Sequence, residues 1–177
     1  MVNGKTVLGV IPARGGSKRF PRKNIAPFRG LPLIVWTIRA AERSEYIDTL
    51  VCSTDDLGVS LIVASAGCRV LSRPSELATD EAISEDVLRH ALSIYPADIV
   101  VLLQPTSPLR TTLDIDACIG MFHVKPVVSY CGTKRNGAVY VCDSQHIDFT
   151  DNIPYIMPTE RSLDIDYKED IYEKSVS

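Results

Sequence analysis

A glycine turn surrounded by basic side chains follows the first apolar run of the chain. The segment Pro12-Ala-Arg-Gly-Gly-Ser-Lys-Arg-Phe-Pro-Arg-Lys-Asn24 carries five basic residues within ten positions. Gly15 and Gly16 have no side chains, so we expect their backbone N–H groups to approach an anion closely. The segment is neither a Walker A loop nor a G-x-G-x-x-G turn, which excludes those two phosphate motifs. A solvated loop is the alternative, but the place directly after a strand favours phosphate binding.

A pair of carboxylates, Asp164 and Asp166, lies near the other end of the chain. Residues at i and i+2 point the same way in an extended segment, and two close carboxylates repel unless a cation lies between them. Mg²⁺ prefers a few carboxylates together with phosphate oxygens and water. From the residues alone, the pair is either a magnesium site or an exposed acidic turn.

Two further polar residues follow predicted strands. Gln104 ends the most apolar run of the chain, where an unpaired buried amide would be costly, and it can both donate to and accept from a ligand. The alternative is a strand-end glutamine whose hydrogen bonds are satisfied within the protein. Arg73 follows a short strand and precedes Pro74. It therefore contacts a ligand at the sheet edge, or else it caps a helix or pairs with Glu76.

Strands that alternate with helices must position these residues. The sequence predicts strands at 6–11, 49–53, 68–71, 99–103, 127–130 and 138–142, and helices at 33–43, 57–66, 83–94 and 113–122. This alternation implies right-handed crossovers and a mostly parallel sheet. Because such sheets bind ligands beyond the carboxyl ends of their strands, we expect the site at the loops after Ile11, Ser53 and Leu103.

The size and composition of the chain are those of one globular domain, which we place at residues 1–177. Apolar residues make up 45% and charged residues 23% of the chain, which excludes disorder, collagen and coiled coil. No stretch approaches the roughly 18 apolar residues of a membrane span, so we expect no membrane partner. The N-terminus lacks signal-peptide features, and five scattered cysteines without C-x-x-C spacing indicate a reducing compartment. We therefore expect a cytoplasmic protein.

The net charge of −3 hides a basic head and an acidic tail. Residues 1–43 carry nine Lys and Arg against one Glu, while residues 143–177 carry nine Asp and Glu against three Lys and Arg. One part would hold an anion and the other a cation; the alternative is a solvated acidic face. The acidic total and the lack of aromatic residues among the basic ones argue against nucleic acid as a partner.

Several motifs together resemble the CMP-sialic acid synthetases (acylneuraminate cytidylyltransferases), a group that includes legionaminate and pseudaminate enzymes. The first is Ile11-Pro-Ala-Arg-Gly-Gly-Ser-Lys18, which continues as Phe20-Pro-Arg-Lys-Asn24. The others follow in the family's order: Ser53-Thr-Asp55, Arg73-Pro-Ser-Glu-Leu-Ala78 with Asp80, Leu102-Leu-Gln-Pro-Thr-Ser-Pro-Leu-Arg110, Asn136-Gly-Ala-Val-Tyr140 and Arg161-Ser-Leu-Asp-Ile-Asp166. The resemblance covers nearly the whole chain. The related KDO cytidylyltransferases look similar only at the first strand and loop.

The resemblance implies a fold, a reaction and a set of site residues. The fold is a three-layer α/β/α sandwich with a mostly parallel, Rossmann-like sheet of the nucleotidyltransferase type. The reaction joins the anomeric hydroxyl of a nine-carbon α-keto acid sugar to the α-phosphate of CTP and releases pyrophosphate. The implied catalytic residues are Arg14, Lys23 and Asp166, of which the first two hold the triphosphate. The implied substrate contacts are Ser17, Asn24, Arg73, Ser84 and Gln104, and the implied Mg²⁺ ligands are Asp164 and Asp166.

The chain departs from the family between about residues 131 and 135. Only three residues separate Val128-Ser-Tyr-Cys131 from Arg135-Asn-Gly-Ala-Val-Tyr140. Family members carry a much longer arm there, which completes the sugar pocket and reaches across a dimer interface. Either the chain is a natural short form, or a mobile segment was left out of a continuous numbering, which predicts a spatial break between Ser129 and Asn136. A homodimer is expected if the arm is present. Without the arm, the alternative function is nucleotide binding without catalysis.

Overall fold

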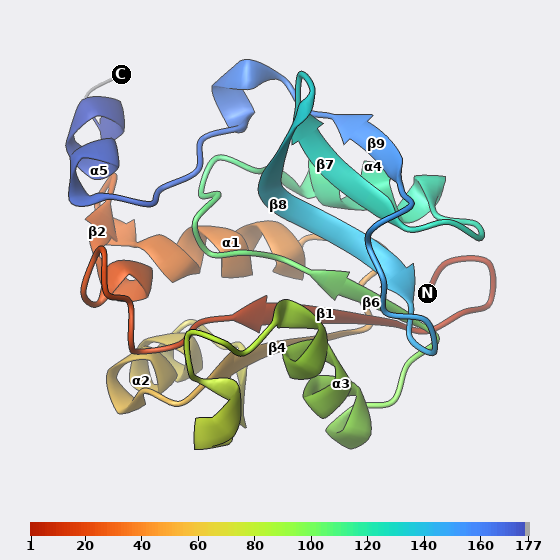
Figure 1. Ribbon diagram of the computed structural model, residues 1–177, viewed down its shortest axis with the longest axis horizontal. Helices are drawn as coiled ribbons and strands as arrows, with labels where there is room; N and C mark the ends of the chain where they lie inside the picture. Colours follow the sequence, from red (N-terminus) through yellow and green to blue (C-terminus); the bar gives the residue numbers. More distant parts are fainter. Residues whose placement is uncertain (176–177) are drawn as a thin grey trace.

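A mostly parallel sheet forms the centre of the molecule (Figure 1). Our computed structural model describes residues 1–175 and the side chains of residues 1–171. Within them, seven strands pair in the order β5-β4-β1-β6-β8-β7-β9. Their bounds are β1 Val7–Pro12, β4 Thr49–Thr54, β5 Arg69–Ser72, β6 Ile99–Leu102, β7 Val127–Cys131, β8 Lys134–Asp143 and β9 Ile153–Ile156. Only β8 among these runs against its neighbours, β6 and β7.

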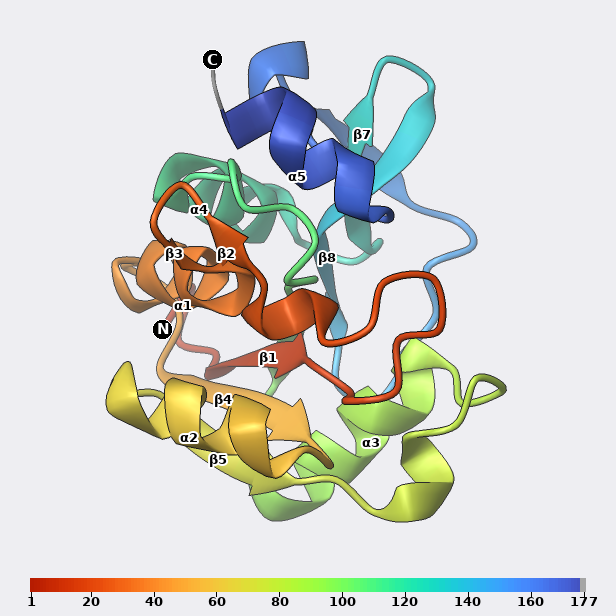
Figure 2. The ribbon, with the colours of Figure 1, turned by 90° about the vertical axis from the view of Figure 1, so that its left-hand side faces the viewer.

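Helices cover both faces of the sheet, which confirms the predicted three-layer sandwich (Figures 1 and 2). Helices α1 (Leu33–Glu42), α2 (Leu57–Ser65) and α4 (Thr112–Met121) pack on one face, and α3 (Ser84–Ile94) packs on the other. The short strands β2 (Pro27–Phe28) and β3 (Leu31–Pro32) form a separate hairpin. Helix α5 (Lys168–Ser175) packs near it through Ile171, which shares a small core with Phe28. No helix of the described residues is long and apolar enough to cross a membrane.

The continuous apolar runs of β1 and β6 are explained by burial on both faces. Ile11 of β1 lies in the core with Ile34 of α1, whereas Val10, the preceding residue, lies in the opposite core with Leu88 of α3. All four residues are fully buried. Because β1 pairs in parallel with β4 and β6, the carboxyl ends of these central strands lie at one edge of the molecule, from which the loops of interest emerge.

Strands β7 and β8 form a hairpin at the place where the family's arm is missing. Tyr130 pairs with Arg135 and Cys131 with Lys134, so Gly132 and Thr133 alone make the turn. The chain runs through this turn from Ser129 to Asn136 within one paired hairpin. The single-domain boundary and the missing arm stay predictions, which the intact mass of the purified chain tests.

Candidate functional site

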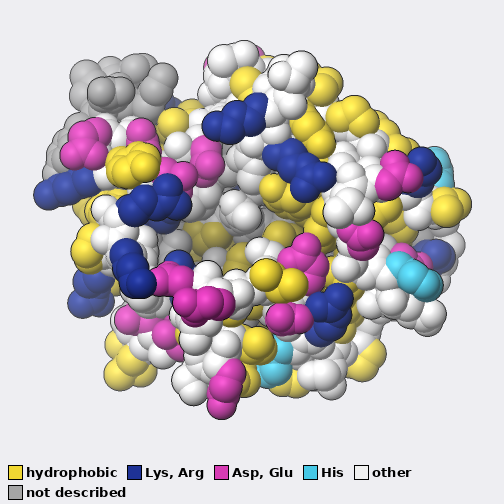
Figure 3. Space-filling view, viewed as in Figure 1, with side chains coloured by type: hydrophobic (Ala, Val, Ile, Leu, Met, Phe, Trp, Pro, Cys, Tyr) yellow, Lys and Arg dark blue, Asp and Glu magenta, His cyan; other side chains and the backbone are white. Residues whose placement is uncertain are grey.

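A cavity of about 520 Å³ opens at the carboxyl edge of the parallel strands, the edge that faces the viewer in Figure 2. The loops after β1, β5 and β6 line it, as expected for a sheet of this type. Figure 3 shows the molecule hollowed near its centre, with basic and acidic side chains gathered around the hollow. Seven of the predicted site residues line the cavity: Arg14, Ser17, Lys23, Asn24, Arg73, Ser84 and Gln104. Asp164 and Asp166 are not in its lining.

Asp80 neutralises the basic loop on one side of this cavity. The Nη2 atom of Arg14 lies 2.7 Å from Asp80 Oδ1, and Arg14 Nη1 donates to the Thr79 carbonyl oxygen at 2.7 Å. The ammonium of Lys18 pairs with the second oxygen of Asp80. Hydrogen bonds from Lys18 and then Arg14 hold the pKa of Asp80 below its usual range. A carboxylate of the protein therefore stands where the sequence predicts an anionic ligand.

Gly15 has a different role from the one its sequence context suggests. Its N–H donates to Asp55 Oδ1 at 3.0 Å, so the prediction that this N–H approaches a bound anion is wrong. A Cβ at Gly15 would lie 2.8 Å from atoms of Asp56, which requires glycine for packing, whereas Gly16 has open space around it. The Asp55 loop after β4 thus supports the basic loop and does not line the cavity.

Lys23 links the basic loop to the C-terminal segment. It begins a 3₁₀ turn, Lys23–Ile25, and its ammonium donates to Asp166 Oδ1 at 3.1 Å. Arg19 approaches the other oxygen of Asp166 at 3.7 Å. Asn24 is buried and donates through Nδ2 to the carbonyl oxygen of Arg14, so it fixes the loop that carries the guanidinium.

Asp164 and Asp166 meet at the edge of the cavity. Asp166 contacts the cavity-lining Lys23, while Asp164 accepts a hydrogen bond from Thr106, which also lines the cavity. Asp164 is exposed at the surface, yet the protein atoms around it, and then the charge of Asp166, raise its pKa above the usual value. The charge of Asp166 is thus the smaller of these two causes, and it places the second carboxylate near the first.

The carboxylate pair fits Mg²⁺ that is shared with a substrate. Among the described residues, no group of three or more His, Cys, Asp or Glu is placed to hold a metal alone. Mg²⁺ binds through one or two carboxylates plus phosphate oxygens and water, and Asp164 and Asp166 at the edge of the cavity can supply those carboxylates. Asp164 and Asp166 are therefore a compatible pair of ligands.

Buried charges anchor the segment that carries these aspartates. Asp114, at the start of α4, has no exposed surface and accepts two hydrogen bonds from Arg161, at 2.8 and 3.0 Å. Tyr155 donates to the same carboxylate. These bonds hold the pKa of Asp114 below its usual range despite burial. Arg161 thereby fixes the chain three residues before Asp164.

Arg73 both lines the cavity and holds the end of β4. Its Nε donates to Ser53 Oγ at 3.1 Å, and its Nη2 donates to the Ser53 carbonyl oxygen at 2.7 Å. It has 7% of its surface exposed, and burial lowers its pKa. None of the described carboxylates pairs with it, so the alternative of a pair with Glu76 is wrong. A buried cation without an ionic partner beside a cavity is suited to an anionic or polar ligand.

The side chain of Gln104 lies against Gly137 of β8. A Cβ at Gly137 would stand 2.6 Å from Gln104 Oε1, so only glycine permits this placement. Arg110, which is buried and whose pKa burial lowers to about 10, donates to the carbonyl oxygens of Gln104 and Ala138. Sequence reasoning gave Arg110 no role, although it ends the motif that contains Gln104. The position of this arginine at the end of the Gln104 motif was the feature of the sequence that could have indicated its role.

A family model decides the relationship of this chain to known proteins. The model described as Cytidylyltransferase matches residues 8–147, which include the whole cavity lining. The chain belongs to the cytidylyltransferase family. Within this family, the basic loop after β1 and the Gln104 segment both fall inside the matched region, whereas Asp164 and Asp166 lie beyond it.

Curated cytidylyltransferases of several kinds are similar to the chain. N-acylneuraminate cytidylyltransferase of Escherichia coli is 31% identical over 209 residues, which cover 93% of this chain and 50% of that protein. CMP-N,N'-diacetyllegionaminic acid synthase of Legionella pneumophila is 38% identical over 134 residues, 70% of this chain and 56% of that protein. The chain spans about half the length of the curated relatives it matches. Because 209 exceeds its own length, the first alignment contains positions that this chain lacks.

The similarity to KDO enzymes is broader than the motifs suggest. 3-Deoxy-manno-octulosonate cytidylyltransferase of Bdellovibrio bacteriovorus is 34% identical over 116 residues, 66% of this chain and 45% of that protein. The prediction that such enzymes resemble the chain only at the first strand and loop is therefore wrong.

Solved cytidylyltransferase-like structures share the fold. A nucleotidyl transferase from Methanothermobacter thermautotrophicus superimposes with a TM-score of 0.79 at 12% identity, over 98% of this chain and 97% of that one. A CMP:2-keto-3-deoxy-manno-octonic acid synthetase complexed with CTP gives a TM-score of 0.62 at 24% identity, over 70% of this chain and 52% of that one.

Proposed function

We propose that the chain transfers the cytidylyl group of CTP to the anomeric hydroxyl of a sialic-acid-like nine-carbon α-keto acid sugar, with release of pyrophosphate. The observation that carries this proposal is a contact at the edge of the cavity between the basic loop and the C-terminal segment. There Lys23, from the basic loop, contacts Asp166, 143 residues away in the sequence. Cations for a triphosphate and carboxylates for a metal are thus in one place, as nucleotidyl transfer requires.

The cavity residues divide into two groups in this proposal. Arg14 and Lys23 hold the phosphates, since a guanidinium suits bidentate contacts and an ammonium acts as a compact charge. Gln104 contacts the sugar. The other polar lining residues contact the nucleotide, namely Ser17, Asn24, Arg73 and Ser84. The CTP present in the related synthetase structure and the acidic sugars named for the curated relatives support this choice of substrates.

Asp164 and Asp166 would hold Mg²⁺ in this reaction. When bound, the ion would offset the charge of the triphosphate and lower the pKa of the attacking hydroxyl. The chain's own part is to present the two carboxylates beside Lys23 and to keep Arg14 on the phosphates. No side chain needs to form a covalent bond to the substrate.

The second candidate is a homologue that binds the nucleotide without catalysis. The two-residue turn between β7 and β8 favours it, because the family's sugar-binding and dimer-forming arm would be inserted there. Both candidates predict CTP binding, so binding alone does not separate them. Formation of CMP-sugar by the full chain separates them, and a homodimer is expected only for a form that carries the arm.

Asp80→Asn is expected to tighten binding of CTP by up to about fivefold. Its carboxylate competes with the phosphates for Arg14 and Lys18, and an ion pair this exposed is worth at most about 1 kcal/mol. Isothermal titration with CTP measures the change. Asp151→Asn, which removes the exposed partner of Lys125 elsewhere, is the matched control and should change nothing. Weaker binding in the Asp80 variant would show that Asp80 orients Arg14 for the nucleotide.

Gly137→Ala is expected to raise the KM for the acceptor sugar more than tenfold, because the new methyl group displaces Gln104. It should also cost about 1–2 kcal/mol of stability, since residue 137 has a φ of +74°. Gly132→Ala is the matched control: its φ is +59°, but its Cβ would meet nothing within 4 Å. Urea unfolding and steady-state kinetics measure both variants. Equal acceptor KM values for the two would contradict the placement of Gln104 in the sugar site.

A further inference from the structure

One part of the sheet carries no helix on the face that α3 covers. Helix α3 packs mainly on β1, β4 and β6, so β7 and β8 extend beyond it. The segment 144–152 crosses this region in front of β8 (Figure 1). From it, the ring of Phe149 meets Tyr140 of β8 edge to face, with centroids 5.2 Å apart. Tyr130 of β7 packs against the same core. Tyr130, Tyr140 and Phe149 together form an aromatic wall on this part of the sheet.

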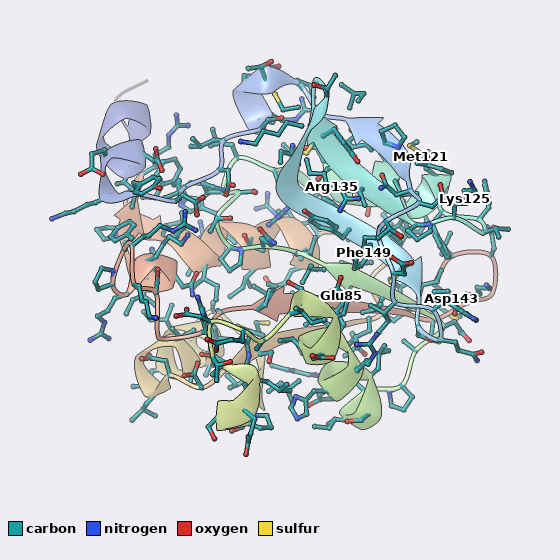
Figure 4. The ribbon with its side chains drawn as sticks, in the orientation of Figure 1. Glu85, Met121, Lys125, Arg135, Asp143 and Phe149 are labelled. Atoms are coloured by element: carbon teal, nitrogen blue, oxygen red, sulfur yellow. The ribbon has the colours of Figure 1, made fainter. Side chains whose placement is uncertain are left out.

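Arg135 stands on this aromatic wall and is held by its neighbours. Figure 4 shows Arg135 on β8, near Phe149 and on the side of the sheet from which Glu85 of α3 also projects. Its Nη2 donates to the carbonyl oxygen of Phe149 at 2.5 Å, and its Nε donates to Tyr130 Oη at 3.2 Å. These two bonds orient the guanidinium plane before any ligand arrives.

Arg135 forms no ion pair with any residue whose side chain the structure describes. Among residues 1–171, whose side chains are described, no carboxylate lies within ion-pair distance of it, and Nη1 makes no hydrogen bond to them. Arg73 of the cavity lining also lacks an ionic partner among the described residues, but four other basic residues there have one. Arg14, Lys18, Arg19 and Lys23 each contact Asp80 or Asp166. An oriented, exposed arginine with an unused nitrogen is built to receive a planar anion.

The backbone of β8 connects Arg135 to the nucleotide cavity. Gly137 lies two residues further along the strand. The side chain of Gln104, which lines the cavity, packs directly against Gly137. Two residues of an extended strand span about 7 Å, a distance that an arginine side chain covers. Tyr140 follows Gly137 on the same strand, so the aromatic residues lie close along β8 to the glycine that contacts Gln104.

We propose that Arg135 binds the carboxylate of the acceptor sugar and so selects acidic sugars over neutral ones. This inference rests on the proposed function and adds to it the residue that reads the acid. A sugar acid has an apolar ring face, which suits Tyr130 and Tyr140, and one carboxylate, which suits the free edge of an arginine. That carboxylate is bonded to the anomeric carbon, so its place beyond Gln104 keeps the reacting hydroxyl on the cavity side.

The experiment compares Arg135→Gln with the wild-type chain on two acceptors. One acceptor is a nonulosonic acid that the wild type uses, and the other is the same sugar with its C1 carboxylate converted to an amide. In the wild type, kcat/KM for the acid should exceed that for the amide by at least about tenfold, as expected for a charge-assisted bidentate contact. In Arg135→Gln this ratio should fall to near one, while the KM for CTP stays unchanged. Arg135→Lys should keep part of the preference.

Lys134→Gln is the matched control, because the neighbouring strand position points to the other face of the hairpin. It removes one positive charge and should keep the full acid preference. An unchanged acid-to-amide ratio in Arg135→Gln, with turnover retained, would overturn this inference and leave the proposed function standing. A wild-type chain that turns over no acid would overturn both. If the acid-to-amide ratio of kcat/KM fell to near one in both Arg135→Gln and Lys134→Gln, the result would indicate a general charge effect. It would then contradict a specific role for Arg135.

Discussion

Asp166→Asn is expected to lower the turnover of cytidylyl transfer by at least about 10²-fold, a loss near 2.7 kcal/mol of transition-state stabilisation. The substitution keeps the size of the side chain and removes one of the two carboxylates that would hold Mg²⁺. The Mg²⁺ concentration needed for half-maximal activity should rise. Steady-state assays over a Mg²⁺ titration measure both effects.

Folding should be spared in this variant. The side chain of Asp166 is 40% exposed, and its contacts with Lys23 and Arg19 are worth little at such a place. Loss of its charge also relieves the repulsion that raises the pKa of Asp164. CTP affinity should change little because Arg14 and Lys23 remain. Asp86→Asn, which breaks an exposed pair with Arg89 on α3, is the control. Near wild-type turnover with unaltered Mg²⁺ dependence would show that Asp166 is a surface acid.

Arg14→Ala is expected to weaken CTP binding about 10- to 150-fold, the equivalent of about 1.5–3 kcal/mol for a charge-assisted contact. Arg14 is one-third exposed at the cavity and is held in place by Thr79 and Asp80. Its guanidinium has to leave Asp80 for the phosphates, so the loss measured in the wild-type background should fall toward the lower end, and removal of Arg14 should cost more in an Asp80→Asn background. Equilibrium titration with CTP measures the affinity.

Arg39→Ala is the matched control for this prediction, because Arg39 is an exposed arginine of α1 that lines a different groove. It should leave CTP affinity unchanged. Unchanged affinity in Arg14→Ala itself would remove Arg14 from the nucleotide site. The thermal stability of both variants should stay close to that of the wild type, since neither side chain is buried.

The sequence predicted the main strands and helices well because their patterns are strong. The apolar run of β1 and the run of β6 each fill both faces of the sheet, and the amphipathic spacing of α3 matches its burial. The sequence missed β9, which is a four-residue edge strand containing Pro154, and α5, whose sequence follows no clear apolar period. Short and polar elements form through tertiary contacts that local pattern does not encode.

Site prediction succeeded where one segment carried the signal and failed where two distant segments met. The basic loop and Gln104 reached the cavity because both directly follow buried strands. The contact of Asp80 with Arg14, and of Asp55 with Gly15, joins residues that only the strand order brings together. The sequence did not indicate a binding role for Arg135. The orientation of its guanidinium depends on contacts with Tyr130 and with the carbonyl oxygen of Phe149, which the sequence pattern does not encode.

Transfer of the α-phosphate of CTP tests the central claim most directly. The purified chain is incubated with Mg²⁺, CTP labelled at the α-phosphate and each of several nonulosonic acids in turn, and CMP-sugar and pyrophosphate are both quantified. We expect label in CMP-sugar with at least one acid, an equal amount of pyrophosphate, and neither product when the acceptor is omitted or the metal is chelated. A folded chain that binds CTP yet forms no CMP-sugar with any of the acids would contradict the claim and leave nucleotide binding alone.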